Sequence, residues 1–195
     1  MTPKKVMLID GNSIMNRAYY GLAGRQNLTA ADGTPTGAVY AFLNMLLSYR
    51  DKIEPDLICT LFDRSEPTFR HEVYEEYKGD RKPMPDDLAL QMPLVKELLD
   101  ALGMKRCELA GYEADDLIGT IARKSVEQGH DVTIVSGDRD LWQLIDDKTD
   151  VLMPLSRGGF TQYELIDAGK LAEEYGITPK QVIDLKALMG DKSDG

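Results

Sequence analysis

The sequence predicts an α/β fold with a mainly parallel sheet that is covered on both faces by helices. Short apolar runs rich in β-branched residues alternate with segments of helical periodicity, which is the pattern of such folds. In addition, three of the apolar runs end on an aspartate: Asp10, Asp63 and Asp138. In a parallel sheet these ends share the carboxyl edge, where open α/β sheets bind their ligands.

The predicted elements follow one another in a regular order. The strands are KVMLID at 5–10, DLICTLFD at 56–63, MKRCEL at 104–109, DVTIVSGD at 131–138 and DVLMPL at 150–155. Helical periodicity covers 36–53, 85–103 and 112–129, and the chain is again helical at 170–176 and 178–190. In the last helix, Thr178 is predicted to be the N-cap, with Pro179 at the first helical position.

Two segments interrupt this alternation. Residues 24–36 have turn residues and little periodicity, and are predicted to form an exposed loop. Residues 64–85 are longer, rich in charged and aromatic side chains, and follow directly on Asp63. A connection of that length within a compact domain is usually functional or disordered.

Composition places the chain among ordinary globular proteins, with 195 residues of which 43% are hydrophobic and 29% charged. The apolar run at the N-terminus is too short for a signal peptide, and no later run is long enough to span a bilayer. Cys59 and Cys107 lie in apolar stretches without a nearby cysteine or histidine, so we expect buried thiols in a reducing cytoplasm. His130 is expected at a surface turn.

Further carboxylates lie next to the predicted sheet edge. The helix at 112–129 begins with Glu113, Asp115 and Asp116, and Asp140 follows Asp138 by two residues. Glu113 and Asp116 share a helix face, whereas Asp115 lies about 100° away from Asp116 around the axis. Each acid alone is explained as a helix cap or as a favourable charge in a first helical turn.

Asp191 and Asp194, in the final GDKSDG, extend the set to nine carboxylates. Nine such groups in one cleft repel one another strongly unless cations bind there. Oxygen ligands without histidine or cysteine suit Mg²⁺ or Mn²⁺ better than zinc, and pairs of these ions serve phosphoryl chemistry. Without these nine, 24 of the 33 acidic residues remain against 23 basic ones, so the net charge of −10 comes mostly from the predicted site.

Other reaction classes find little support. The sequence has no Walker A loop, which argues against a nucleoside triphosphatase. It has no credible Ser–His–Asp set, because its only histidines are His71 and His130.

Five motifs resemble a known family, in the same order along the chain. They are LIDGNSIMNRAYYGL, FRHEVYEEYKGDRKPMPDDL, YEADDLIGT, SGDRDLWQL and LMGDKSDG, and they run from about Lys4 to Asp194. They resemble the flap-endonuclease family of 5′→3′ exonucleases, which includes the N-terminal domain of bacterial DNA polymerase I. The resemblance implies a PIN-like (resolvase-like) domain at 1–166, with a helical arch at about 64–90. It implies that 167–195 is the start of a helix–hairpin–helix subdomain, truncated by the end of the sequence.

The resemblance also implies a role for each candidate residue. The metal ligands are expected to be Asp10, Asp63, Glu113, Asp115, Asp116, Asp138, Asp140, Asp191 and Asp194, the last two belonging mainly to a second ion. Lys78 and Arg81, in YKGDR, match basic residues that meet the scissile phosphate and stabilise developing charge. Arg70, Tyr77 and Arg17 are further candidates for binding DNA; Tyr77 either stacks on a base or packs within the arch.

The leading prediction is therefore a nuclease that uses two Mg²⁺ or Mn²⁺ ions to hydrolyse DNA phosphodiesters at 5′ ends and flaps. Its expected partner is DNA with a 5′ flap or 5′ end, and the domain is expected to be monomeric, fused to polymerase domains, and located in the bacterial cytoplasm at the nucleoid. Two alternatives stay open. One is a truncated, catalytically silent fragment that binds single-stranded DNA. The other is a PIN-type ribonuclease, which shares the fold but gives no reason for the YKGDR segment.

Overall fold

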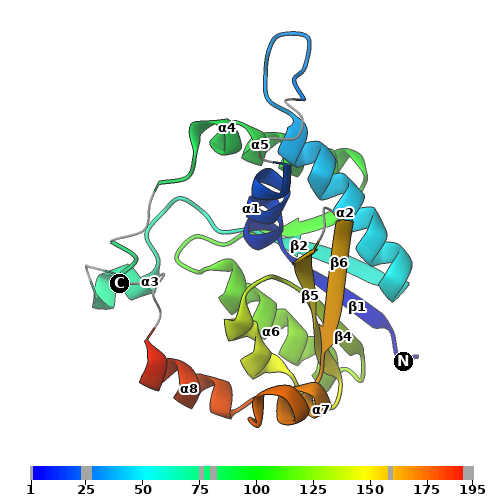
Figure 1. Ribbon diagram of the computed structural model, residues 1–195, viewed down its shortest axis with the longest axis vertical. Coiled ribbons are helices and arrows are strands. Elements are labelled where there is room, and N and C mark those ends of the chain that lie inside the picture. The colour runs from blue at the N-terminus through cyan, green and yellow to red at the C-terminus, as the bar shows by residue number, and fades with distance from the viewer. Residues whose placement is uncertain (1, 23–27, 75–76, 80–82, 158–159, 191–195) are drawn as a thin grey trace.

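A six-stranded sheet forms the centre of the structure, a computed structural model that describes residues 2–22, 28–74, 77–79, 83–157 and 160–190 (Figure 1). The strands are β1 (Lys5–Asp10), β2 (Leu57–Leu61), β3 (Lys105–Cys107), β4 (Asp131–Val135), β5 (Thr149–Arg157) and β6 (Phe160–Ile166). Their order in the sheet is β3-β2-β1-β4-β5-β6, and all neighbours pair in parallel except β5 and β6. The predicted mainly parallel sheet is confirmed.

β6 is the one strand that was not predicted. It pairs antiparallel with β5 in a register that joins Arg157 to Phe160. The sequence carries the signal for this pairing, because two strand-like runs are separated by only two residues, Gly158 and Gly159. β6 therefore adds an antiparallel edge to an otherwise parallel sheet.

Helices cover both faces of the sheet (Figure 1). α1 (Gly11–Leu22), α2 (Gly37–Ile53) and α5 (Gln91–Ala101) pack on one face, and α6 (Ala114–Glu127) packs on the other. The helix predicted at 85–103 is divided into α4 (Asp86–Ala89) and α5. Pro93 explains the division, because it has no N–H to donate and, in an uninterrupted helix, its ring would clash with the carbonyl of Ala89 four residues earlier.

Shorter elements complete the chain. α3 (Phe69–Val73) lies within the 64–85 segment, the 3₁₀ helix η1 (Arg139–Leu144) follows β4, and α7 (Ala168–Lys170) leads into the π-helical η2 (Leu171–Tyr175). α8 (Gln181–Met189) begins later than predicted, and Thr178 is not its N-cap. Instead, the Thr178 N–H and hydroxyl both donate to Gln181 Oε1, at 2.9 and 3.0 Å, and stabilise the turn before the helix.

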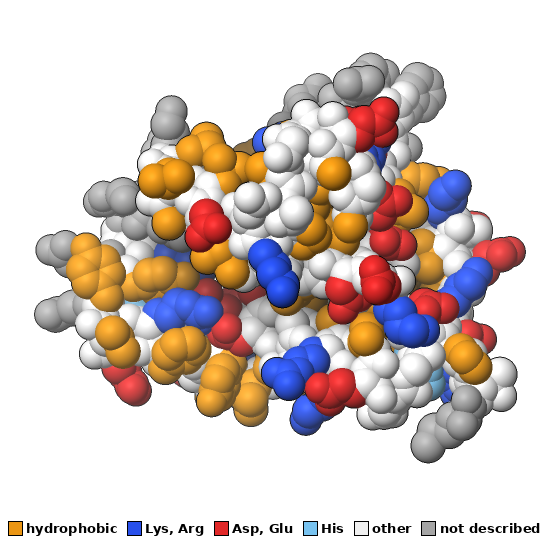
Figure 2. All heavy atoms as spheres, turned by 90° about the horizontal axis from the view of Figure 1, so that it is seen from below, with side chains coloured by type: hydrophobic (Ala, Val, Ile, Leu, Met, Phe, Trp, Pro, Cys, Tyr) orange, Lys and Arg blue, Asp and Glu red, His pale blue; other side chains and the backbone are white. Residues whose placement is uncertain are grey.

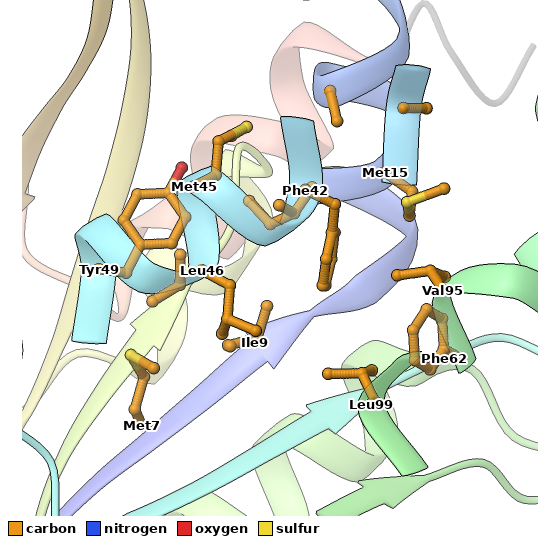
Figure 3. Close-up of a cluster of buried hydrophobic side chains, with 14 of the residues drawn as sticks. Met7, Ile9, Met15, Phe42, Met45, Leu46, Tyr49, Phe62, Val95 and Leu99 are labelled. Atoms are coloured by element: carbon orange, nitrogen blue, oxygen red, sulfur yellow. The ribbon is translucent and has the colours of Figure 1, made fainter. Parts of the chain in front are cut away.

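Side-chain alternation along β1 divides the core into two clusters. Met7 and Ile9 pack against Phe42, Leu46 and other residues of α2 on one face (Figure 3). Val6 and Leu8 face α6 and pack in the cluster that contains Ile118. Leu171 and Val182 belong to this second cluster, so the chain after β6 is anchored on the α6 side of the sheet.

The same alternation places the first two aspartates. Alternate side chains along a strand point to the same face, so Asp10 lies on the same side of the sheet as Val6 and Leu8 of β1. By the same rule, Asp63 lies on the same side as Cys59 and Leu61 of β2, and this is the side that α6 covers. Both carboxylates therefore lie at the carboxyl end of the sheet and on the face that α6 covers.

Two single-residue expectations need correction. His130 is not a surface residue: it is 8% exposed, because the turn at Gly129 brings it beside the start of β1, where the Lys4 N–H donates to Nδ1 at 3.4 Å. Cys59 and Cys107 are free thiols as expected, but both are only half-buried. No helix in the described part of the chain is both long and apolar enough to cross a membrane.

Candidate active site

A cavity of about 710 Å³ opens at the carboxyl end of the sheet. Five of the nine predicted carboxylates line it: Asp10, Asp63, Glu113, Asp115 and Asp138. They come from the end of β1, the segment after β2, the first turn of α6 and the segment after β4. The other lining residues are Asn12, Ser13, Asn16, Lys78, Met84, Ala114, Gly137, Arg139 and Lys186.

Hydrogen bonds hold Asp10 at the centre of this arrangement. Its Oδ1 accepts from the Ser13 N–H at 2.9 Å, and its Oδ2 accepts from the Ser136 hydroxyl at 2.7 Å. The buried Ser136 hydroxyl in turn accepts from the Asp138 N–H at 3.0 Å. One serine thus connects the acid of β1 to the acid that follows β4.

A second set of hydrogen bonds connects Asp63 to α6. The Asp63 N–H donates to Asn12 Oδ1 at 3.0 Å, and Asp63 Oδ1 accepts from the Ala114 N–H at 2.7 Å. Ser13 Oγ accepts from the Gly137 N–H at 3.0 Å. Asn12, Ser13 and Ser136 were not predicted as site residues; the available signal was a small polar residue beside each acid, in DGNS and SGD.

Burial raises the pKa of two of the five acids. The pKa of Asp10 rises to about 6, mainly because the carboxyl is buried and secondarily because Asp63 and Asp138 lie nearby. The pKa of Asp115 rises to about 8, again mainly through burial, with further contributions from Asp10, Asp138 and Asp63. Near neutral pH, Asp115 is therefore mostly protonated in the absence of a cation.

The donor set fits a hard divalent cation, because it consists of carboxylate oxygens that are unfavourable to ionise together. No three acidic, histidine or cysteine side chains in the described residues are grouped tightly enough to coordinate one ion as they stand.

Asp116 differs from its neighbour Asp115 and does not line the cavity. Its carboxylate forms two bonds of 2.8 Å with the Arg70 guanidinium, and it accepts from the Glu113 N–H at 3.0 Å in a capping box. The Arg70 contact lowers the pKa of Asp116. The approximately 100° between successive helical residues explains why only Asp115 faces the cavity.

Glu113 contacts the 64–85 segment through both of its oxygens. Lys78 Nζ lies 2.9 Å from Oε1, and the Tyr77 hydroxyl donates to Oε2 at 3.2 Å. Lys78 has a left-handed backbone with φ of 59°. The Tyr77 ring packs edge-on against His71 at 5.3 Å, as in the packing alternative, and stacking on a base stays a prediction.

The remaining predicted residues lie away from the cavity or outside the described part. Asp140 Oδ1 forms an ion pair of 2.6 Å with Lys186 Nζ, and Asp140 does not line the cavity. Arg17, on α1, is half-buried. Burial raises the pKa of the Tyr49 hydroxyl, and the positive charge of Arg17 partly offsets that rise. Arg81, Asp191 and Asp194 lie outside the described residues.

On the face shown in Figure 2, the basic side chains do not form a single patch. Acidic and basic side chains are interspersed there. This agrees with the nearly equal numbers of acidic and basic residues that remain once the nine predicted ligands are set aside.

Comparison with known proteins gives consistent relatives. The sequence model of the family described as 5′-3′ exonuclease, N-terminal resolvase-like domain, matches residues 5–176. DNA polymerase I of Streptococcus pneumoniae (strain ATCC BAA-255 / R6) is 46% identical over 195 residues, which is 100% of this chain and 22% of the relative. DNA polymerase I of Bacillus subtilis (strain 168) is 44% identical over 191 residues, 98% of this chain and 21% of the relative. The chain thus spans about a fifth of the length of these curated relatives.

Solved structures share the fold at lower identity. A T5 5′-exonuclease with bound zinc ions superposes with a TM-score of 0.74 at 22% identity, covering 98% of this chain and 68% of that one. A complex of the bacteriophage T5 flap endonuclease with DNA and metal ions has a TM-score of 0.69 at 23% identity, with coverage of 98% and 68%. The catalytic core of Rad2 with a DNA substrate has a TM-score of 0.59 at 18% identity, with coverage of 99% and 56%.

Proposed function

The chain belongs to the family of 5′-3′ exonuclease N-terminal resolvase-like domains, and from that premise we propose that it hydrolyses DNA phosphodiester bonds at 5′ ends and flaps with the help of bound divalent ions. One observation carries the proposal. Five carboxylates from four separate parts of the chain line one cavity at the carboxyl edge of the sheet, beside Lys78.

We propose two Mg²⁺ or Mn²⁺ ions as the cofactors. Asp10, Asp63, Glu113, Asp115 and Asp138 are the residues that would hold them, with Asp140, Asp191 and Asp194 as further candidates toward the second ion. Ions of this kind supply a hydroxide nucleophile at neutral pH and stabilise the leaving oxygen. The solved T5 relatives hold metal ions, which supports a divalent cation at this site.

The protein's own residues position the substrate and the carboxylates. The Lys78 ammonium lies at the cavity and, once released from Glu113, is available to a phosphate oxygen of the substrate. Asp116 is proposed to hold Arg70 and the first turn of α6 in place rather than to bind an ion, because both of its oxygens are engaged there. Arg81 is proposed to act beside Lys78, and Arg17, Arg70 and Tyr77 to contact DNA.

The relatives also support a wider proposal. Because they are DNA polymerase I chains about five times longer than this one, we propose that polymerase domains follow this domain and that it acts as a monomer on chromosomal DNA in the bacterial cytoplasm. The division into a nuclease unit at 1–166 and the start of a second subdomain at 167–195 stays part of this proposal.

The test of function is cleavage of a 5′-labelled flap DNA in Mg²⁺, compared with the same reaction in EDTA and with an RNA flap of the same sequence. We expect cleavage of DNA in Mg²⁺ only, and its loss in Asp115→Asn. DNA binding without cleavage at saturating Mg²⁺ and Mn²⁺ would instead support the silent fragment. Preferential cleavage of the RNA flap would support a PIN-type ribonuclease.

A further inference from the structure

Arg139 is one of the basic residues at the wall of the cavity. It is the first residue of η1 and lies in sequence between Asp138 and Asp140. It lines the cavity together with the five carboxylates, and its side chain is exposed. Its guanidinium carbon lies 5.2 Å from the centroid of the Trp142 ring, in a cation–π contact.

The surface that supports Arg139 is fixed. Trp142 is only 4% exposed, and the centroid of its ring lies 5.1 Å from the centroid of the Tyr175 ring. A cation–π contact with an indole ring restrains a guanidinium without consuming its N–H donors, which can then form a bidentate contact with a phosphate. The contact with Trp142 therefore favours a position of the Arg139 side chain at the cavity wall and leaves its donors available.

The charge environment of Arg139 differs from that of the other basic residues at the cavity. Lys78 pairs with Glu113, and Lys186 pairs with Asp140. Within the described residues, Arg139 has no hydrogen bond or ion pair to a carboxylate, although it lies in sequence directly between Asp138 and Asp140. A phosphate that approaches Arg139 does not have to displace any acidic side chain of the described residues from it.

We propose that Arg139 binds a backbone phosphate of the DNA strand that is cleaved, at the cavity wall formed by η1. The inference rests on the proposed function, because it assigns a residue to the substrate of that reaction. Phosphate contacts position a nucleic acid without reading its sequence, so Arg139 contributes to affinity and placement at any sequence. Lys78 comes from the segment between α3 and α4, so the substrate is held from two separate parts of the chain.

The experiment measures binding of fluorescein-labelled 5′-flap DNA by anisotropy in EDTA, where hydrolysis does not proceed. Arg139→Gln is compared with Arg139→Lys and with Arg123→Gln. Arg123 lies on α6, does not line the cavity and is 82% exposed, so its variant controls for the loss of one positive charge. Because Trp142 is the only tryptophan of the chain, its emission provides a second readout next to Arg139.

We expect Arg139→Gln to weaken binding about five- to tenfold and to reduce the salt dependence of binding by about one phosphate contact. Arg139→Lys is expected to lose less, because it keeps the charge but not the bidentate geometry, and Arg123→Gln to lose less than twofold. In Mg²⁺, Arg139→Gln should raise KM and leave kcat within about twofold. DNA should change the Trp142 emission of the unmodified chain and of Arg123→Gln, but not that of Arg139→Gln.

Equal affinity and equal salt dependence of Arg139→Gln and Arg123→Gln would overturn the inference and leave the proposed function standing. A fall in kcat with unchanged KM would also overturn it. If the unmodified chain neither binds nor cleaves flap DNA, the proposed function fails, and this inference with it.

Discussion

Asp115 and Asp116 are adjacent on the first turn of α6, yet the pKa values of their carboxyl groups shift in opposite directions. Burial and the acids around it raise the pKa of Asp115 to about 8, whereas the Arg70 guanidinium lowers that of Asp116. The cause is helical geometry, which turns one side chain toward the cavity and its neighbour toward α3. The two residues therefore allow a matched test of which carboxylates serve the cavity.

Asp115→Asn should stabilise the metal-free protein at high pH. The folded-state pKa of about 8 exceeds the ordinary 3.8, so the folded protein binds more protons than the unfolded one and loses stability as pH rises from 3.8 to 8. The asparagine variant lacks this loss. Its gain in unfolding free energy should grow by about 4 kcal/mol between pH 5 and pH 8, as measured by urea unfolding in EDTA. A gain that does not change with pH would show that Asp115 is ionised at little cost.

Asp116→Asn should have the opposite effect on stability. It removes the charge that pairs with Arg70 but keeps an oxygen for the Glu113 N–H, so a loss of about 1 kcal/mol is expected above pH 4. The loss should shrink as pH falls below 3.8, through the lowered pKa of Asp116. A double-mutant cycle with Arg70→Gln should give a coupling of about 1 kcal/mol that weakens in high salt. Additive effects would mean that the ion pair contributes nothing.

Binding of Mg²⁺ or Mn²⁺ should release protons. At pH 7, Asp115 is mostly protonated in the metal-free protein, because its pKa is about 8. A bound cation requires the ionised carboxylate, so roughly one proton per chain should leave. Calorimetry in two buffers with different ionisation enthalpies measures this number. Asp115→Asn should release roughly none, and equal release from both proteins would place the cation elsewhere.

Lys78→Asn should slow cleavage without weakening ion binding. Asparagine tolerates the left-handed backbone, so the substitution removes the ammonium with little strain. We expect a rate about 100-fold lower, from the loss of charge at the phosphate. Affinity for the cation should stay equal or rise, because Glu113 loses a competing partner. An unchanged single-turnover rate would remove Lys78 from the proposed machinery.

Gly11→Ala should destabilise the protein. A Cβ at Gly11 would lie 2.4 Å from Cε1 of Phe62, which is fully buried, so the ring must move. We expect a loss of about 2 kcal/mol in thermal or urea unfolding. The double variant Gly11→Ala/Phe62→Leu should recover part of the lost stability, because the smaller side chain leaves room for the Cβ. Gly21→Ala is the control on the same helix, because no atom of the described residues lies within 4 Å of its Cβ position, and it should be neutral or slightly stabilising.

Much of the fold was predictable because its signals are local. Runs of β-branched residues predicted β1, β2, β4 and β5, and the parallel pairing then brought Asp10, Asp63 and Asp138 to one cavity. Two errors came from local signals that were present but not used. The glycine pair before β6 indicated a hairpin, and Pro93 indicated the break between α4 and α5.

The partners of the charged side chains were less predictable, because they depend on how distant segments pack. Arg70 and Asp116 are 46 residues apart, and nothing in either motif indicates their pairing. His130 was misplaced for the same reason, since it is covered by the start of β1, 126 residues earlier. The angle of about 100° between Asp115 and Asp116 was known from helical geometry, yet both were predicted to be metal ligands, because the pairing of Asp116 with Arg70 could not be read from the sequence.

Glu113 uses one oxygen for Lys78 and the other for Tyr77. A divalent ion that takes up this carboxylate competes for the same two atoms, so ion occupancy and the docking of residues 77–78 are thermodynamically linked. Linkage works in both directions: conditions that detach these residues favour loading of the ion, and loading favours their detachment to the same extent. The free energy of the contacts that Glu113 makes with Lys78 and Tyr77 is therefore subtracted from the free energy of ion binding, and it sets part of the ion concentration at which the site is half occupied.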